Sequence, residues 1–181
     1  MGRAAFLISL LHAVGGDADL SDVVYFSALA RHLEASSPGT VKRHQAYVEC
    51  LRATGVHVEL ARFKEKRIQC PLCRRAIVRH EEKETDVAIG ARLVEMLVRN
   101  QCDSAVLVTG DSDIAPALRT ARRLFPTKNI CCCFPYRRQS LGLKRLANKS
   151  FSISKEHHLR HRLPDPFVLP DGRIVAKPAR W

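Results

Sequence analysis

The chain has few acidic residues for its length. Its 181 residues include 18 Asp and Glu against 30 Lys and Arg, which gives a net charge of +12. Such an imbalance favours a polyanionic partner, and nucleic acid is the usual one. A basic surface kept for solubility is the alternative. The sequence also lacks internal repeats and low-complexity runs, so its length fits one domain with appendages.

The sequence has no spaced disulfide framework and no membrane-spanning run. Its seven cysteines are an odd number, and Cys131–Cys133 are consecutive within an apolar run, as small hydrophobic residues of a buried strand would be. A reducing compartment, the cytoplasm, is therefore expected. The apolar stretch 4–14 is too short to span a bilayer, and a buried or amphipathic helix is favoured there over a signal peptide. No membrane partner is expected.

Apolar periodicity predicts an alternation of strands and helices. Strands are predicted at 23–27, 56–63, 104–109, 129–134 and 151–154. Helices are predicted at 4–14, 40–53, 87–98, 114–124 and 141–147. This alternation indicates an α/β protein, a three-layer α/β/α sandwich with a mainly parallel sheet.

The domain organisation follows from a change in composition along the chain. Residues 1–155 are predicted to form the domain, with a basic, cysteine-bearing insertion at 64–80. A basic, proline-containing tail follows at 156–181. Within it, Leu169-Pro-Asp-Gly172 predicts the turn of a small hairpin.

Carboxylates gather around one predicted strand end. Asp111 and Asp113 follow the apolar run 105–108, and open α/β sheets bind their ligands at the carboxyl ends of such strands. Asp86 begins another helix. Convergent carboxylates bind Mg²⁺ or Mn²⁺, ions that activate water and neutralise charge on a phosphodiester. The alternative is that Asp111 and Asp113 only cap the helix that follows.

Two acidic motifs carry a resemblance to a known family. They are Glu82-Lys-Glu-Thr-Asp-Val87 and Val106-Leu-Val-Thr-Gly-Asp-Ser-Asp-Ile-Ala-Pro-Ala117. In this order and spacing they resemble the NYN domain, specifically the LabA-like branch of the PIN-like ribonuclease superfamily. The resemblance continues through Val24–Ala28, Ala46–Tyr47, Ala61–Phe63 and Phe134–Pro135, and covers roughly residues 22–155. It implies a parallel sheet with helices on both faces and a divalent-metal site that cleaves RNA.

The resemblance also implies site residues. Asp86, Asp111 and Asp113 match the catalytic carboxylates that hold Mg²⁺ or Mn²⁺, and Thr109 and Ser112 match the small hydroxyl positions beside them. Thr109 and Ser112 are therefore also predicted to contact RNA. The sequence departs from the family at its start, because no Asp-Gly-x-Asn motif precedes Val23. The family's first strand, which supplies a central metal ligand, is therefore expected to be missing, through truncation or loss.

Three hypotheses follow from the resemblance and the departure. The first is a divalent-metal-dependent endoribonuclease. The second is an RNA-binding or regulatory NYN protein that is weakly active or inactive. The third is a truncated product that folds poorly.

Basic residues flank the predicted strand ends. They would position RNA, expected to be single-stranded, through its phosphates, and Tyr136 would stack a base. Solvated surface charge is the alternative, and a homo-oligomer is left open. The RNA-binding set is Lys64, Lys66, Arg67, Arg74, Arg75, Tyr136, Arg137 and Arg138.

Cysteine and histidine pairs suggest further metal sites. Cys70-Pro-Leu-Cys73 supplies two ligands of a Zn²⁺ site, with His80 as a third. Free thiols in a surface loop are the alternative. The histidines of the tail, His157, His158 and His161, are interpreted as a solvated basic segment, with metal binding as the alternative.

Overall fold

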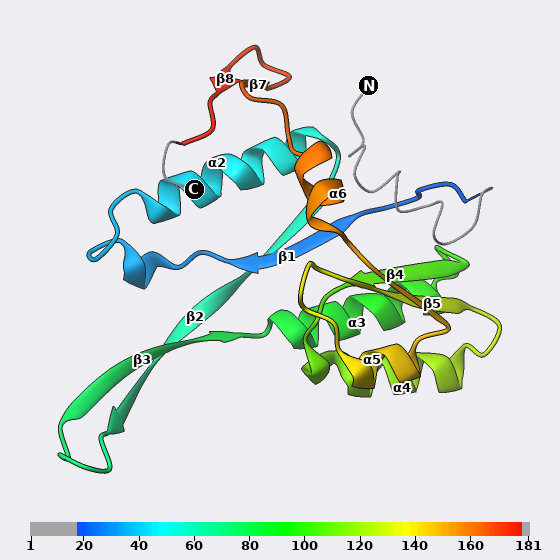
Figure 1. Cartoon of the computed structure of the whole chain (residues 1–181), viewed down its shortest axis with the longest axis horizontal. Coiled ribbons are helices and arrows are strands. Elements are labelled where there is room, and N and C mark those ends of the chain that lie inside the picture. The colour runs from blue at the N-terminus through cyan, green and yellow to red at the C-terminus, as the bar shows by residue number, and fades with distance from the viewer. Residues whose placement is uncertain (1–17, 179–181) are drawn as a thin grey trace. The chain divides into compact units, whose positions relative to one another are not determined.

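The structure is a computed structural model that describes residues 18–178 (Figure 1). The chain divides into two compact units. One combines Met1–Val23 with Asp86–Pro164, and the other combines Val24–Thr85 with Asp165–Trp181. The helix predicted at 4–14 lies outside the described residues. Among those that are described, no helix has both the length and the apolar character needed to cross a membrane.

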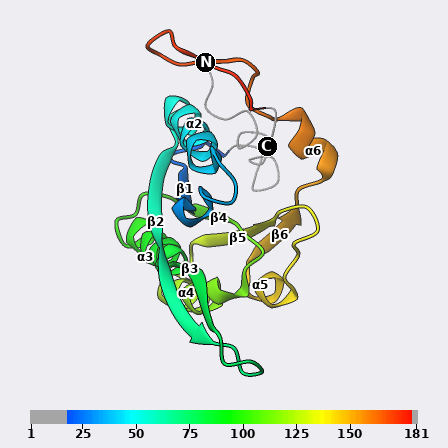
Figure 2. The same ribbon diagram turned by 90° about the vertical axis from the view of Figure 1, so that its left-hand side faces the viewer.

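The first unit contains a fully parallel sheet in the order β4-β5-β6. Figure 2 shows β5 between its two neighbours. The strands are β4 (Ser104–Val108), β5 (Asn129–Phe134) and β6 (Lys149–Ser152). The helices are α3 (Thr85–Val98), α4 (Ala115–Leu124), α5 (Leu141–Leu146) and α6 (Lys155–Arg160), with the 3₁₀ turn η2 (Ser112–Ile114) before α4. All of these except α6 and η2 match predicted elements within a few residues.

The central strand β5 forms the core of this unit. Its side chains Ile130, Cys132 and Phe134 join a buried cluster with residues of α3, α4 and α5. On its opposite face, Cys133 packs against Ile153. Burial raises the pKa of Cys132 to about 11 and that of Cys133 to about 12, so both thiols stay neutral. The prediction that Cys131–Cys133 act as small hydrophobic residues is confirmed, because all three are buried.

The second unit begins with a parallel βαβ arrangement. Strand β1 (Val24–Ala28) pairs with β2 (His57–Gln69), and α2 (Thr40–Ala53) connects them after the short turn η1 (Arg31–Leu33). The Glu34 carboxylate accepts hydrogen bonds from the N–H groups of Gly39 and Val41 and so caps the start of α2. Buried Val48 and Cys50 lie on this helix.

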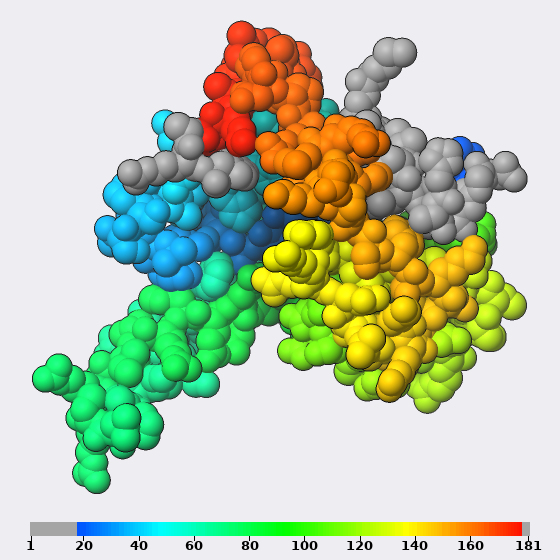
Figure 3. Space-filling view, viewed as in Figure 1, coloured from blue at the N-terminus to red at the C-terminus, as the bar shows by residue number. Residues whose placement is uncertain are grey.

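The insertion predicted at 64–80 is mostly strand. Strand β2 continues to Gln69 and pairs antiparallel with β3 (Ala76–Lys83), forming an arm that Figure 3 shows as a narrow projection of this unit. Ion pairs support it, including Lys66–Glu81 at 3.5 Å and Arg62–Glu84 at 2.7 Å. A ribbon exposed on both faces has no buried side, so its sequence lacks the apolar alternation that marks a strand.

The hairpin predicted in the tail is present. Strands β7 (Phe167–Val168) and β8 (Ile174–Val175) pair antiparallel, and Gly172 N–H donates to the Leu169 carbonyl at 2.9 Å in the turn. Arg173 ion-pairs with Glu49 of α2, which ties the hairpin to that helix.

The predicted α/β class with mainly parallel strand pairing is confirmed. In the described residues the strands form two three-stranded sheets and this hairpin.

Candidate active site

The loop after β4 orders its acidic residues by local hydrogen bonds. Thr109 N–H donates to the Cys133 carbonyl at 3.2 Å, which extends the β4–β5 ladder by one residue. Thr109 Oγ1 accepts from Asp111 N–H at 3.0 Å, and Asp111 Oδ1 accepts from Asp113 N–H at 3.0 Å. Asp111 thus caps η2, as one alternative predicted. Its carboxylate is nevertheless solvent-exposed, as are Ser112 and Asp113, so the cap does not preclude chemistry.

Gly110 lets this loop pack on the loop after β5. A Cβ added to Gly110 would lie 2.1 Å from the backbone oxygen of Arg138 and 2.9 Å from its Cβ. No larger residue fits that space without moving the backbone. This role of Gly110 is not among the predictions from the sequence. The available signal was a glycine at the boundary of a strand and an acidic loop, which is where a close backbone approach is expected.

The loop after β5 presents the predicted RNA-binding trio of the first unit. Tyr136, Arg137 and Arg138 are all exposed, and the guanidinium carbon of Arg137 lies 5.2 Å from the centre of the Tyr136 ring. Arg137 has a φ of +59°, an uncommon backbone conformation for a residue with a side chain, and such residues gather at functional sites. The contact at Gly110 therefore brings a basic loop beside the acidic one.

Asp86 lies exposed in the first turn of α3. One helical turn later, Gly90 packs on α4, where an added Cβ would meet the Cβ of Ala117 at 3.0 Å. This close approach packs the second turn of α3 against the first turn of α4. An acidic side chain is favoured at a helix N-terminus, so Asp86 also has a structural reason to be there.

The described carboxylates do not complete a metal site. Across residues 18–178, no three His, Cys, Asp or Glu side chains are grouped so that they could hold an ion. Oxygen donors such as Asp111 and Asp113 suit Mg²⁺ or Mn²⁺ chemically. Mg²⁺ needs only one or two protein carboxylates when water and substrate phosphates complete its coordination, so Asp111 and Asp113 are the described residues that would hold it.

The predicted three-ligand zinc site is not formed. Cys70 and Cys73 lie in the turn between β2 and β3, whereas His80 pairs with Glu65, four residue pairs down the arm from Gln69–Ala76. At the usual rise of a strand this is about 14 Å. The His80 ring stacks instead on His32, with ring centres 4.1 Å apart. His80 is therefore not a ligand that Cys70 and Cys73 can share.

The three tail histidines do not form a metal cluster. His157 and His161 lie 4.4 Å apart between ring centres, and His158 is exposed. Burial, and then the proximity of His161, lower the pKa of His157. The interpretation as a solvated basic segment stays a prediction. The segment also contains the helix α6, which the sequence pattern does not predict.

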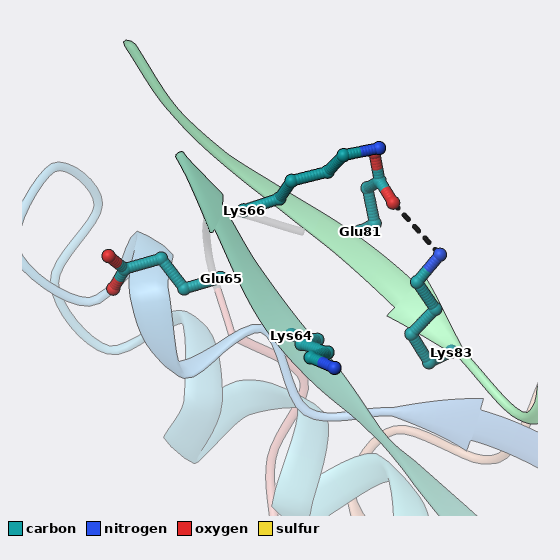
Figure 4. A pocket seen from close by; sticks show the side chains of 5 residues that line it. All are labelled: Lys64, Glu65, Lys66, Glu81 and Lys83. Carbon is teal, nitrogen blue, oxygen red and sulfur yellow. Dashed lines mark ion pairs between the residues drawn. The ribbon is translucent and has the colours of Figure 1, made fainter. Parts of the chain in front are cut away.

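The basic residues of the arm are partly neutralised. Lys64, Lys66, Glu65, Glu81 and Lys83 line a shallow pocket on it (Figure 4). Glu81 ion-pairs with Lys83 at 2.8 Å and Lys66 at 3.5 Å, and the hydrogen bond from Lys83 followed by the charge of Lys66 lowers its pKa.

Two further groups of basic residues stand on the same arm. Arg67 ion-pairs with Glu65 at 3.2 Å, and Arg74 and Arg75 are exposed at the tip. The arm belongs to the second unit, whereas Arg137 and Arg138 belong to the first, so its part in RNA binding stays a prediction.

The stacked histidines predict a pH-dependent stability. Burial, and then the charge of His80, lower the pKa of His32 from its ordinary 6.5. The unfolded chain then binds the proton more readily, so the free energy of unfolding should fall as the pH drops below about 6.5. Urea denaturation at a series of pH values measures this. His32→Phe, which keeps a ring against Phe63, should flatten the slope, while His158→Gln should not. An unchanged slope in His32→Phe would contradict the assignment.

Comparison with known proteins identifies the family. The family model described as the NYN domain matches residues 14–152. This chain belongs to the NYN domain family. The match spans the described β1 to β6 and includes Asp86, Asp111 and Asp113. NYN domains are generally nucleases of the PIN-like group. The match therefore supports the predicted membership of the PIN-like ribonuclease superfamily.

Part of the chain is similar in sequence to a named bacterial protein. The chain is 32% identical over 108 residues to 6-hydroxy-3-succinoylpyridine 3-monooxygenase HspA of Pseudomonas putida (strain DSM 28022 / S16). That match covers 56% of this chain and 33% of the relative, so the chain spans about a third of that protein.

A solved structure shares the fold. It is a crystal structure of a protein of unknown function, VPA0982, from Vibrio parahaemolyticus RIMD 2210633. It superposes with a TM-score of 0.53 at 19% sequence identity, over 80% of this chain and 76% of the other. This likeness supports the fold alone.

Proposed function

We propose that this NYN domain is a ribonuclease that cleaves RNA phosphodiester bonds at the carboxyl end of β4. The observation that carries the proposal is the close approach of Gly110 to Arg138. A Cβ added to Gly110 would lie only 2.1 Å from the Arg138 backbone oxygen. This contact holds two loops together. One loop carries the exposed carboxylates of Asp111 and Asp113, and the other carries the exposed guanidinium groups of Arg137 and Arg138. Nuclease chemistry needs acidic groups and phosphate-binding groups at one place.

The residues have distinct proposed roles. Arg137 and Arg138 bind backbone phosphates, and Tyr136 stacks a base of single-stranded RNA. Thr109 and Ser112 line the acidic loop and contact the RNA. An Asp111 carboxylate whose free oxygen faces solvent can accept the proton of an attacking water. Asp86 and Asp113 complete the acidic group.

The proposal has two further parts. The chain belongs to the LabA-like branch of the family, and its cleavage reaction depends on a divalent ion. Mg²⁺ or Mn²⁺, if bound near Asp111, would neutralise charge that builds up on the phosphate. We also propose a cytoplasmic location, because all seven cysteines are free thiols, as is usual in a reducing compartment.

The test is cleavage of a labelled single-stranded RNA by the purified chain. Product formation in Mn²⁺ or Mg²⁺ that stops with EDTA supports the metal-dependent nuclease. Product formation that EDTA does not affect supports a nuclease without a divalent ion. The second candidate is an NYN protein that binds RNA without cutting it, and it is favoured by the shortage of metal donors in residues 18–178. RNA binding without product in any ion would establish that candidate instead.

Replacing both arginines of the β5 loop should weaken RNA binding at low salt. If Arg137 and Arg138 each contact one phosphate, Arg137→Ala/Arg138→Ala should reduce the slope of log K against log salt by about 1.4, since each contact on a single strand contributes about 0.7. Fluorescence anisotropy across a salt series measures the slope. Lys144→Ala/Arg145→Ala, which removes the same charge from α5, is the control. Equal losses from both variants would mean that the loop has no specific role.

A further inference from the structure

The tip of the β2–β3 arm holds two cysteines in a tight turn. The strand ladder ends at Gln69–Ala76, and beyond it Cys70 N–H donates to the Arg75 carbonyl at 2.9 Å. Arg74 N–H donates back to the Cys70 carbonyl at 2.8 Å, and Arg74 has a φ of +56°. The turn is open to solvent, because Leu72 is 94% exposed and Cys73 is exposed as well.

Backbone groups of this turn point at one sulfur. The backbone N–H groups of Cys73 and Leu72 and the Cys73 side chain lie within hydrogen-bonding reach of the Cys70 thiol. Successive N–H groups that converge on one atom form an anion-binding nest, as they do around the sulfur ligands of metal centres. Such donors orient a thiolate for a metal before the metal arrives. The turn is therefore half of a sulfur-ligand site.

Residues 18–178 do not supply the other half. A structural Zn²⁺ site has four ligands, and the tip has two. His80 lies about 14 Å down the arm. The remaining cysteines are held in cores: Cys50 and Cys131–Cys133 are buried, and Cys102 packs against the core cluster of the first unit.

We propose that one Zn²⁺ ion joins the arm tips of two copies of this chain, with Cys70 and Cys73 of each copy as its four ligands. The exposed, projecting turn lets two tips meet without a clash between their strands. The four thiols release four protons to solvent, and the resulting centre carries a charge of 2−. Arg74 and Arg75 of each copy stand beside it and offset that charge. Without the ion, the same arginines would repel each other across the pair of tips.

The experiment uses the full chain, kept in a reductant that does not chelate metal. Zinc is added and the excess removed. Metal content is measured by mass spectrometry, and molecular mass by light scattering. We expect one zinc per two chains and a dimer that a chelator returns to monomer. Replacing zinc with Co²⁺ should give the intense thiolate-to-cobalt absorption of a four-sulfur site.

Two variants distinguish the proposed zinc bridge from a zinc site within one chain and from a dimer that does not need zinc. Cys70→Ser/Cys73→Ser should lose both zinc and the dimer, whereas His80→Ala should keep both. One zinc per chain in a monomer, loss of zinc in His80→Ala, or no zinc binding would overturn the proposal. So would a dimer that survives chelation or persists in the double serine variant. None of these readouts depends on RNA cleavage, so the proposed ribonuclease activity and the zinc bridge can fail independently.

Discussion

Asp111→Asn should reduce RNA cleavage roughly 100-fold or more, because a positioned proton acceptor contributes about 10²–10⁴-fold to the rate. Asn keeps an oxygen that can accept the hydrogen bond from Asp113 N–H, which is 3.0 Å in the native loop, so η2 should stay capped. The variant therefore removes a negative charge and a proton acceptor while retaining the local fold.

The measurement is the initial rate of cleavage of single-stranded RNA, with thermal melting recorded in parallel. Asp19→Asn is the matched control, because Asp19 is an exposed carboxylate of the same unit outside the acidic loop. We expect the control to cleave like the native chain and both variants to melt normally. Native-like cleavage by Asp111→Asn would remove this carboxylate from the proposed site.

Gly110→Ala should destabilise the domain and impair the site together. The new Cβ would lie 2.1 Å from the Arg138 backbone oxygen, so the two loops must separate by about 1 Å to restore normal contact. Overpacking of this kind costs about 1–3 kcal/mol, against which the lower entropy of the unfolded alanine chain returns about 0.4–1 kcal/mol. The melting temperature should fall by several degrees, since 1 kcal/mol corresponds to about 2–4 °C at this size.

Gly142→Ala provides the control for the same chemical change. Its added Cβ would meet nothing closer than Ser140 Oγ at 3.9 Å, and it lies in α5, where alanine is favoured over glycine by about 1 kcal/mol. That variant should be as stable as the native chain or more so. If Gly110→Ala melts like Gly142→Ala and binds RNA normally, the contact between the loops does not organise the site.

Much of the fold could be predicted because its strands and helices have one apolar side. The run of Cys131–Cys133 within β5, and the helical spacing in α2, α3 and α4, each reflect burial against a core. The arm formed by β2 and β3 was interpreted as an insertion, since exposed charged residues cover both of its faces. Helix α6 has six residues and none is buried, so it leaves little periodic signal.

The candidate site was predictable in its residues more than in its geometry. The acidic motif around Asp111 marks a strand end in sequence, and the structure places it there, exposed and capped. The position of His80 shows the opposite case. Its short separation from Cys73 in sequence suggested a shared metal, but an extended strand carries it away along the arm.

The amino-acid sequence by itself determined the α/β class, the NYN family, the excess of positive charge and the acidic strand end, because these depend on local patterns and residue types. Only the tertiary structure decided that Gly110 holds a basic loop beside the acidic one and that the two thiols of Cys70 and Cys73 stand alone at an exposed tip. Those facts depend on which distant segments touch. Contacts between segments arise from packing and strand register, which no local pattern specifies.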